Sequence, residues 1–208
     1  MRMRKKRHGA ERIALCADFI VHEASEMPPF PCELEIGCGK GAFICECAKR
    51  HPSVDFVAME KIPDVLLLAA EKVKGMQIPN VRFIVGDAKN LRDYFPEKSV
   101  NRIYLNFSDP WPKSGHYKRR LTYRGVLERY REILTDGGEI VFKTDNRGLF
   151  DFSLGEFSAS GFELRDMTYD LHNSPFSADN IETEYEKIFS EKGFSINRVV
   201  AKLKNGAE

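Results

Sequence analysis

The sequence predicts a single α/β domain, in which helices cover both faces of a mostly parallel, doubly wound sheet. Short runs rich in β-branched and apolar residues alternate with longer segments of helical pattern, which is typical of parallel sheets. A glycine-rich turn joins the first of these runs to the first helical segment. The length of 208 residues suits one domain with a sizeable core.

The elements of the first half follow from local signals. The first buried strand is entered through Pro31, and Pro63 stands in the first turn of a helix, where proline is favoured. Apolar runs mark the other strands. We predict strands at 33–36, 54–59, 81–85 and 103–107, and helices at 41–49 and 63–73.

The second half continues the alternation and ends in two late strands. Gly137-Gly138 is expected to close the helix before it, and residues 170–180 are polar and rich in turn formers. We predict helices at 123–134, 149–159 and 182–189, and strands at 139–142, 162–167 and 196–201.

Composition excludes several classes of protein. No apolar run approaches the roughly 18 residues that span a membrane, and the basic N-terminus lacks the apolar segment of a signal peptide. The five cysteines form no C-x-x-C pair, which predicts reduced thiols in a cytoplasmic protein. The five histidines show no metal-ligand spacing, so we expect no metal site.

Positive charge is concentrated in two segments. Residues 1–12 contain six Lys or Arg and one Glu, and residues 113–131 contain seven Lys or Arg and one Glu, in a chain whose net charge is +1. Such clusters are either solvated faces or contacts for a polyanion, and two of them favour the polyanion. We expect residues 1–12 to be a flexible basic arm and residues 13–208 to be the folded domain.

The turn after the first strand reads Leu34-Glu35-Ile36-Gly37-Cys38-Gly39-Lys40-Gly41. Its glycines let the backbone approach a ligand. The pattern also satisfies the G-x-G-x-x-A of dinucleotide sites, because Ala42 follows. However, Glu35 would repel a pyrophosphate, whereas it suits the ammonium group of S-adenosylmethionine.

Two further acids follow the next strands. Glu60 ends the second strand, about 20 residues after the glycines, where an acid can accept hydrogen bonds from ribose hydroxyls. Asp87 ends the third strand, where it could accept one from the adenine amino group. Alternatively, these acids only cap helices or turns.

The stretch Asn106-Phe107-Ser108-Asp109-Pro110-Trp111-Pro112-Lys113 follows the fourth strand. It places a carboxylate and the chain's single Trp in a rigid turn at the ligand-binding edge of the predicted sheet. A carboxylate, a large aromatic and a rigid turn at such a place favour a pocket for a flat, polar base, and the adjacent cations suggest that the base is attached to phosphates. Trp111 either stacks on a base or packs against the edge of the sheet.

Together these segments carry a resemblance to a known family. Leu34–Gly41, Glu60, Gly86-Asp87-Ala88, Ser108–Lys113, Lys118–Leu121, Phe142–Asn146 and Thr183–Glu186 occur in the order found in bacterial tRNA (guanine-N(7)-)-methyltransferases, which the chain resembles from about residue 31 to residue 202. The resemblance implies a Rossmann-like class I methyltransferase fold, with a seven-stranded sheet whose last strand is antiparallel. It implies methyl transfer from S-adenosylmethionine to a guanosine in the tRNA variable loop.

The resemblance also implies roles for residues. It assigns cofactor binding to Glu35, Glu60, Asp87 and Asp109, which join Gly37 and Gly39 of the glycine turn, and it assigns the catalytic role to Asp109. It assigns substrate contacts to Lys113, Asp145, Thr183, Glu184, Tyr185 and Glu186, and RNA contacts to Gly115, His116, Tyr117, Lys118, Arg119 and Arg120. Thr183 and Glu186 also form a capping-box pattern, and Asp145 could simply begin a helix. The sequence leaves open whether the protein is a monomer or a homodimer.

Two other functions share these features. Methyltransferases that act on an exocyclic amine of a base in RNA or DNA use an Asn/Asp-Pro-Pro-aromatic turn, and Asp109-Pro110-Trp111 is close to it. A nicotinamide-dependent oxidoreductase would share the glycine turn, but Glu35 and the lack of a Tyr-x-x-x-Lys site weigh against it. A non-catalytic RNA-binding protein fits least, because strand-end acids repel phosphate.

Overall fold

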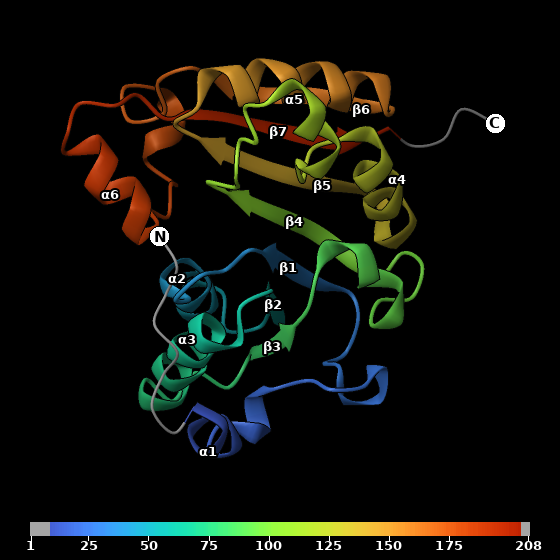
Figure 1. Cartoon of the computed structure of the whole chain (residues 1–208), viewed down its shortest axis with the longest axis vertical. Coiled ribbons are helices and arrows are strands. Elements are labelled where there is room, and N and C mark those ends of the chain that lie inside the picture. The colour runs from blue at the N-terminus through green and yellow to red at the C-terminus, as the bar shows by residue number, and fades with distance from the viewer. Residues whose placement is uncertain (1–8, 205–208) are drawn as a thin grey trace.

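The computed structural model describes residues 9–204. These residues form one seven-stranded sheet with the order β3-β2-β1-β4-β5-β7-β6 (Figure 1). Strands β1 to β5 pair in parallel, whereas β7 pairs antiparallel with both β5 and β6. The predicted sheet, mostly parallel with an antiparallel last strand, is therefore confirmed. The strands are β1 (Cys32–Ile36), β2 (Phe56–Glu60), β3 (Val81–Val85), β4 (Val100–Asn106), β5 (Leu134–Thr144), β6 (Phe162–Thr168) and β7 (Asn197–Leu203).

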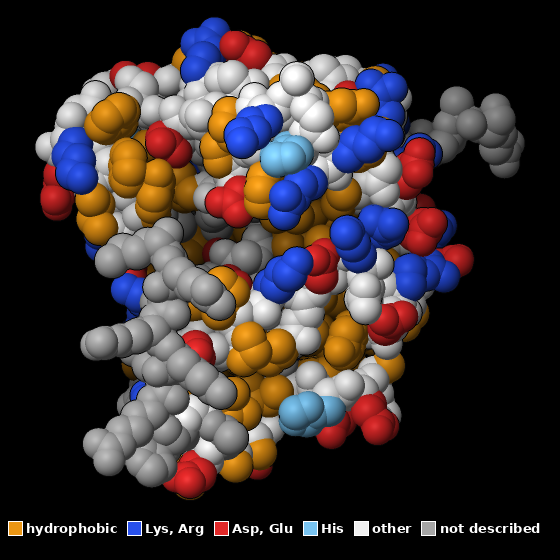
Figure 2. All heavy atoms as spheres, viewed as in Figure 1, with side chains coloured by type: hydrophobic (Ala, Val, Ile, Leu, Met, Phe, Trp, Pro, Cys, Tyr) orange, Lys and Arg blue, Asp and Glu red, His pale blue; other side chains and the backbone are white. Residues whose placement is uncertain are grey.

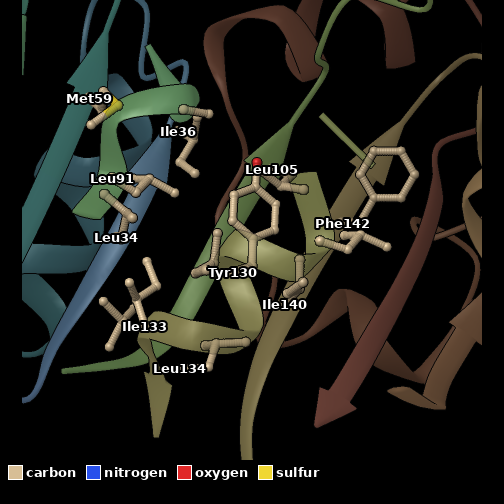
Figure 3. Close-up of a cluster of buried hydrophobic side chains, with 14 of the residues drawn as sticks. Leu34, Ile36, Met59, Leu91, Leu105, Tyr130, Ile133, Leu134, Ile140 and Phe142 are labelled. Carbon is tan, nitrogen blue, oxygen red and sulfur yellow. The ribbon is translucent and has the colours of Figure 1, made fainter. Parts of the chain in front are cut away.

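Helices cover both faces of the sheet and divide the core in two. One cluster packs α4 and α5 against β1, β4 and β5, and Figure 3 shows Tyr130 of α4 among Leu105, Ile140 and Phe142. The other cluster packs α2 and α3 against the opposite face of the sheet. The α-helices are α1 (Gly9–Ala14), α2 (Ala42–Arg50), α3 (Pro63–Gly75), α4 (Arg124–Ile133), α5 (Arg147–Ala159) and α6 (Glu184–Ser190).

The N-terminal segment is described only from residue 9 onward. Most of the basic arm expected at residues 1–12 lies outside the described residues. Its last residues belong to α1, and the Arg12 guanidinium forms an ion pair of 2.7 Å with Glu71 of α3. Arg12 thus stabilises the packing of α1 on α3.

The prediction that Gly137-Gly138 closes the fourth helix is wrong. Helix α4 ends at Ile133 because Leu134 is already extended, with φ of −68° and ψ of 138°. Strand β5 begins there, and its register with β4 is interrupted between the pairs Val100–Leu134 and Arg102–Glu139. The two glycines therefore lie in an irregularity inside β5, a common position for glycine in strands.

Two findings bear on the expectations from composition. No helix within residues 9–204 is long and apolar enough to cross a membrane. All five cysteines are free and buried.

One glycine is required where the sheet meets α2. Gly41, which precedes α2, has φ of +73°, and a Cβ placed on it would lie 2.7 Å from the Cβ of Ala69 in α3. Both the backbone conformation and the close approach of the two helices therefore exclude a side chain.

We expect Gly41→Ala to lower the free energy of unfolding by about 1–3 kcal/mol, because it combines backbone strain with overpacking. The matched control is Gly155→Ala in α5, where the added Cβ meets nothing within 4 Å and φ is ordinary. Since Gly155 is exposed within a helix, that change should stabilise the protein by about 0.5–1 kcal/mol. Urea unfolding of both variants tests this, and equal stability would contradict the packing argument.

Candidate functional site

The candidate site lies at the edge of the sheet where the parallel strands end. In Figure 1 the arrowheads of β1, β4 and β5 point toward the side on which α6 lies. This edge is the usual ligand-binding place of open α/β sheets. Glu35, Glu60, Asp87, Asp109 and Asp145 lie at or just beyond the carboxyl ends of the first five strands, so the structure brings the predicted acids to one edge.

Glu60 holds the glycine turn in place. Gly37 and Gly39 have φ of +82° and +55°. The Gly39 N–H donates to Oε2 of Glu60 at 3.2 Å, while the Ile62 N–H donates to Oε1 at 3.0 Å. A carboxylate has about four acceptor positions, so Glu60 keeps capacity for the hydroxyls of a ribose while it orders the turn.

Glu35 is buried and only half satisfied. Its side chain accepts one hydrogen bond, at Oε1 from the Asn106 amide at 3.1 Å, and Oε2 has no partner. Burial raises the pKa of Glu35 to about 7, opposed by the Asn106 hydrogen bond and by the charge of Lys143, and assisted by the charge of Glu60. An unpaired buried acceptor is costly and calls for an explanation such as a missing ligand.

Two residues at and just after the end of β4 also have a buried polar atom without a hydrogen-bond partner. These atoms are Oδ1 of Asn106 and Oγ of Ser108. Asn106 ends β4 and contacts Glu35, and Ser108 follows Asn106 by two residues in the chain. These three unpaired acceptors, which we call the Glu35 cluster, suit a cationic group rich in donors. Sequence reasoning quoted Asn106 and Ser108 within the Asp109 stretch but assigned them no role.

Asp87 is more exposed and has two partners. It accepts from the backbone of Lys89, which caps a short 3-10 helix (Ala88–Asp93), and it forms an ion pair of 2.9 Å with Lys61. Burial opposes its ionisation, but the hydrogen bonds from Lys61 and Lys89 hold the pKa of Asp87 below its usual range. The cap that sequence reasoning offered as an alternative is therefore present, and the carboxylate remains partly open to a ligand.

The Asp109 turn is held by Arg120. The guanidinium donates to the carbonyl oxygens of Pro110 at 2.9 Å and Trp111 at 3.3 Å, and it lies 4.3 Å from the centre of the Phe152 ring. Asp109 itself is exposed at the tip of the turn. Arg120, expected to contact RNA, is thus occupied within the protein, because tertiary packing turns its guanidinium toward the turn.

Trp111 is half-buried, and a cation covers one face of its ring. The guanidinium carbon of Arg119 lies 3.6 Å from the ring centre, and His116 contacts the ring edge with 6.0 Å between the centres. Both come from the 3-10 helix η4 (Ser114–Arg119). Trp111 therefore serves as a platform for Arg119 and does not enter either core cluster. The other predicted RNA contacts, Gly115, Tyr117 and Lys118, are exposed in the same loop, and so is Lys113, which was predicted to contact the substrate.

The start of α6 reaches the same edge. The Tyr185 ring lies 5.0 Å from that of Phe107, which directly follows β4, and the Tyr185 hydroxyl lies 3.5 Å from Oδ2 of Asp145. Burial, the charge of Asp145 and their hydrogen bond raise the pKa of Tyr185. Glu184 is exposed and pairs with Lys72 at 2.9 Å. These contacts bring Tyr185 and Asp145 together beside the Asp109 turn.

Thr183 and Glu186 face inward. They form the predicted capping box: the Glu186 N–H donates to Oγ1 of Thr183 at 2.9 Å, and the Thr183 N–H donates to Oε2 of Glu186 at 3.4 Å. Glu186 is fully buried, and its carboxylate lies 2.6 Å from the ammonium of Lys143. This differs from the expectation that the whole segment contacts a substrate, because Glu186 is enclosed by protein partners. Lys143 was not assigned a role from the sequence, although a Lys directly after Val141-Phe142 in a buried strand was a signal.

Cations gather beside the acidic edge. Figure 2 shows Lys and Arg side chains spread over the upper and right parts of the face in view, next to a hollow. Lys113, Lys118 and Arg119 are exposed members of this basic segment. Acids inside and cations outside suit a cationic cofactor together with a polyanionic substrate.

Comparison with known proteins first defines the class. The family described as "Putative methyltransferase" matches residues 30–199. The solved structure of a 16S rRNA methyltransferase, KamB, superposes with a TM-score of 0.62 at 14% sequence identity, over 98% of this chain and 96% of that chain. The fold and the family match together define a class I methyltransferase.

Closer relatives define the family. The tRNA (guanine-N(7)-)-methyltransferase of Geobacillus sp. (strain WCH70) is 44% identical over 211 residues, covering 97% of this chain and 96% of that protein. The tRNA (guanine-N(7)-)-methyltransferase of Brevibacillus brevis (strain 47 / JCM 6285 / NBRC 100599) is 50% identical over 171 residues, covering 82% of this chain and 80% of that protein. The chain belongs to the tRNA (guanine-N(7)-)-methyltransferase family, which also decides against the oxidoreductase alternative.

The residues present fit the methyl donor of this family. S-adenosylmethionine carries an ammonium group, a ribose and an adenine. The unpaired Oε2 of Glu35 is a buried acceptor for the ammonium, and the remaining acceptor positions of Glu60 and Asp87 suit hydroxyl and amino donors. The donor set and the orphaned atoms therefore match the group.

We expect the affinity for S-adenosylhomocysteine to rise with pH up to about 7 and then to level off, since the pKa of Glu35 lies at about 7. Below this pH the ligand's ammonium must displace a proton from Glu35, which weakens binding by up to about tenfold per pH unit. Calorimetry between pH 5.5 and 7.5 measures this dependence. In the control Glu35→Gln the dependence should disappear, and an identical profile in both proteins would contradict the assignment.

Proposed function

We propose that this protein transfers the methyl group of S-adenosylmethionine to nitrogen 7 of a guanosine in the variable loop of tRNA. The observation that carries the proposal is the juxtaposition of the unpaired buried acceptors of the Glu35 cluster with the exposed Asp109 turn and its cations. We further propose that it acts in the cytoplasm, which the free, buried cysteines support.

The reaction needs positioning more than proton transfer. Nitrogen 7 of guanine carries an in-plane lone pair and no hydrogen, so attack on the sulfonium methyl requires no general base. The cofactor supplies this electrophilic methyl group. The protein must hold the base in line with it and exclude water. The rigid turn that Arg120 fixes, together with the contact of Tyr185 with Phe107, supports such positioning.

Asp109 is the residue to which we assign the catalytic role. Methylation makes the purine cationic as the sulfonium loses its charge, and a fixed carboxylate beside the ring stabilises the developing charge. The same carboxylate could accept hydrogen bonds from the ring N–H and the amino group of guanine. Adenine does not present this pair of donors. Phe107 and Trp111 on either side adopt φ of +53° and +41°, so the turn holds the carboxylate in a particular direction.

Substrate contacts are proposed for the exposed part of the α6 segment and the loop. Tyr185 and Asp145 lie together beside the Asp109 turn, where they can contact the target nucleoside. Lys113, Lys118 and Arg119 are exposed and can contact phosphates, and the basic residues within 1–7 are proposed as further contacts. Thr183 and Glu186 are proposed to hold Tyr185 in place rather than to contact the RNA.

Nucleoside analysis tests the proposed reaction. Unmodified tRNA is incubated with the protein and labelled S-adenosylmethionine, digested and separated into nucleosides. The expected product is 7-methylguanosine from a single position in the variable loop. An N-methylated exocyclic amine would instead favour the alternative that the Asp109-Pro110-Trp111 turn resembles, and no product would reject both.

We expect Asp109→Asn to slow single-turnover methyl transfer by about 10²- to 10³-fold, the scale of one preorganised electrostatic contact. Affinity for tRNA should change little, because most of it comes from phosphate contacts. The control is Asp136→Asn, which also removes one carboxylate charge. Asp136 lies near the start of β5, and the candidate site lies at the other end of that strand. Wild-type transfer rates in Asp109→Asn would remove this residue from the mechanism.

The double variant Lys118→Ala, Arg119→Ala should weaken tRNA binding and lower the slope of log affinity against log salt by about 1–2. Binding of S-adenosylhomocysteine should be unchanged. The matched control is Lys98→Ala, Arg165→Ala, which removes two exposed cations that pair with local carboxylates. Filter binding at several salt concentrations gives the slopes, and equal slopes would mean that the loop is only a solvated surface.

A further inference from the structure

Lys143 is a buried cation that the proposed mechanism does not use. It lies near the end of β5, two residues before Asp145, and only 3% of its side chain is exposed. Burying a lysine is costly unless it is paired and hydrogen-bonded. The groups that satisfy it therefore indicate what it holds together.

All three protons of the ammonium are donated to one segment of the chain. Lys143 donates to Oδ1 of Asn180 at 3.0 Å, to the carbonyl oxygen of Ile181 at 2.8 Å and to Oε2 of Glu186 at 2.6 Å. Asn180 in turn donates to Oε1 of Glu186 at 2.7 Å. We call Lys143, Asn180 and Glu186 the clasp, because they join β5 to the segment that begins α6.

The clasp fixes the position of Tyr185. Glu186 is one member of the capping box that opens α6, and Tyr185 stands between the two residues of that box. From there the Tyr185 ring contacts Phe107, and its hydroxyl lies beside Asp145. A shift of the clasp would therefore move Tyr185 away from the reaction edge.

The backbone of Lys143 supports the same edge from β4. Its carbonyl oxygen accepts from the Phe107 N–H at 2.9 Å, directly before the Asp109 turn, and its neighbour in the register is Asn106. One residue thus contacts the strand that leads to Asp109 and the segment that carries Tyr185.

Lys143 also lies near the Glu35 cluster, because Asn106, its neighbour in the register, donates to Oε1 of Glu35 at 3.1 Å. Burial lowers the pKa of Lys143, opposed by the charge and hydrogen bond of Glu186 and by the charges of Glu35 and Cys47. In turn the charge of Lys143 favours the ionised form of Glu35, while Glu60 disfavours it. The ring centre of Phe43 in α2 lies 5.3 Å from the ammonium and closes the site on that side.

A requirement for stability alone does not explain this arrangement. Replacing a buried ion pair with neutral side chains of similar shape is often without cost to stability. The Lys143 ammonium donates only to the segment 180–186, which carries Tyr185 to the edge of the sheet where the reaction is proposed to occur. Its directional hydrogen bonds specify one position of that segment, which apolar contacts would specify less sharply.

We propose that Lys143 is a positioning residue that holds Tyr185 and Asp145 against the target base and is the cationic neighbour of the Glu35 cluster, thereby linking the substrate segment to the cofactor site. The proposal rests on the proposed function, because the target base is the guanosine of that reaction. Its cofactor side can be measured without any methyl transfer.

The test is the double variant Lys143→Met, Glu186→Gln, which removes both charges and keeps unbranched side chains of similar length. We expect a folded protein whose kcat on tRNA falls by about 10- to 100-fold, as a small misplacement at a reaction centre costs, while KM for tRNA stays nearly constant. We also expect the pH midpoint of S-adenosylhomocysteine binding to move upward, because Glu35 loses its cationic neighbour. The matched control is Arg165→Met, Glu163→Gln, which removes a surface ion pair of β6.

A wild-type kcat together with an unchanged pH midpoint would overturn the proposal and leave a structural ion pair. If the double variant does not fold, Asn180→Ala decides, since it removes one arm of the clasp and keeps both charges. That variant should lower kcat and leave the pH midpoint unchanged, and a wild-type kcat would overturn the proposal. If the wild-type protein methylates no tRNA, the proposed function fails, whereas the pH midpoints of wild type and double variant still test the link to Glu35.

Discussion

The parallel pairing of β1 with β2 and β4 is the constraint on which the site depends. It sets Glu35 opposite Ala58 on one side and Tyr104 on the other, so that Glu35 points to the same face of the sheet as Asn106. Side chains alternate along a strand, and a shift of one residue would turn Glu35 to the other face. The packing of apolar residues on both faces excludes such a shift, because each core cluster would lose its strand contacts.

Within this frame the charges are arranged in layers. Glu35 lies buried next to Asn106, and Glu60 orders the glycine turn that follows Glu35 in the chain. Asp109 and the cations Lys118 and Arg119 lie further out, in contact with solvent. A cationic cofactor and a polyanionic RNA can approach one edge because the carboxylates and the cations occupy different depths.

Several charged residues of the motifs contribute by holding other residues. Arg120 is bound to the backbone of the Asp109 turn and to Phe152. Glu186 is bound to Lys143 and Thr183. These residues keep Asp109 and Tyr185 in defined positions, which suits a reaction that depends on orientation more than on proton transfer.

The amino-acid sequence by itself determined the order of strands and helices, the strand-end acids and the family, because these depend on local patterns and motif spacing. Only the tertiary structure decided that Gly137 and Gly138 lie inside β5, since the pairing of β5 with β4 overrides the local glycine signal. The tertiary structure alone also decided that Lys118 and Tyr185 are exposed, whereas Arg120 and Glu186 are bound to other groups of the protein. Adjacent side chains in a loop or on a short helix point in different directions, and which of them finds a partner depends on residues far away in the chain, such as Phe152 for Arg120 and Lys143 for Glu186.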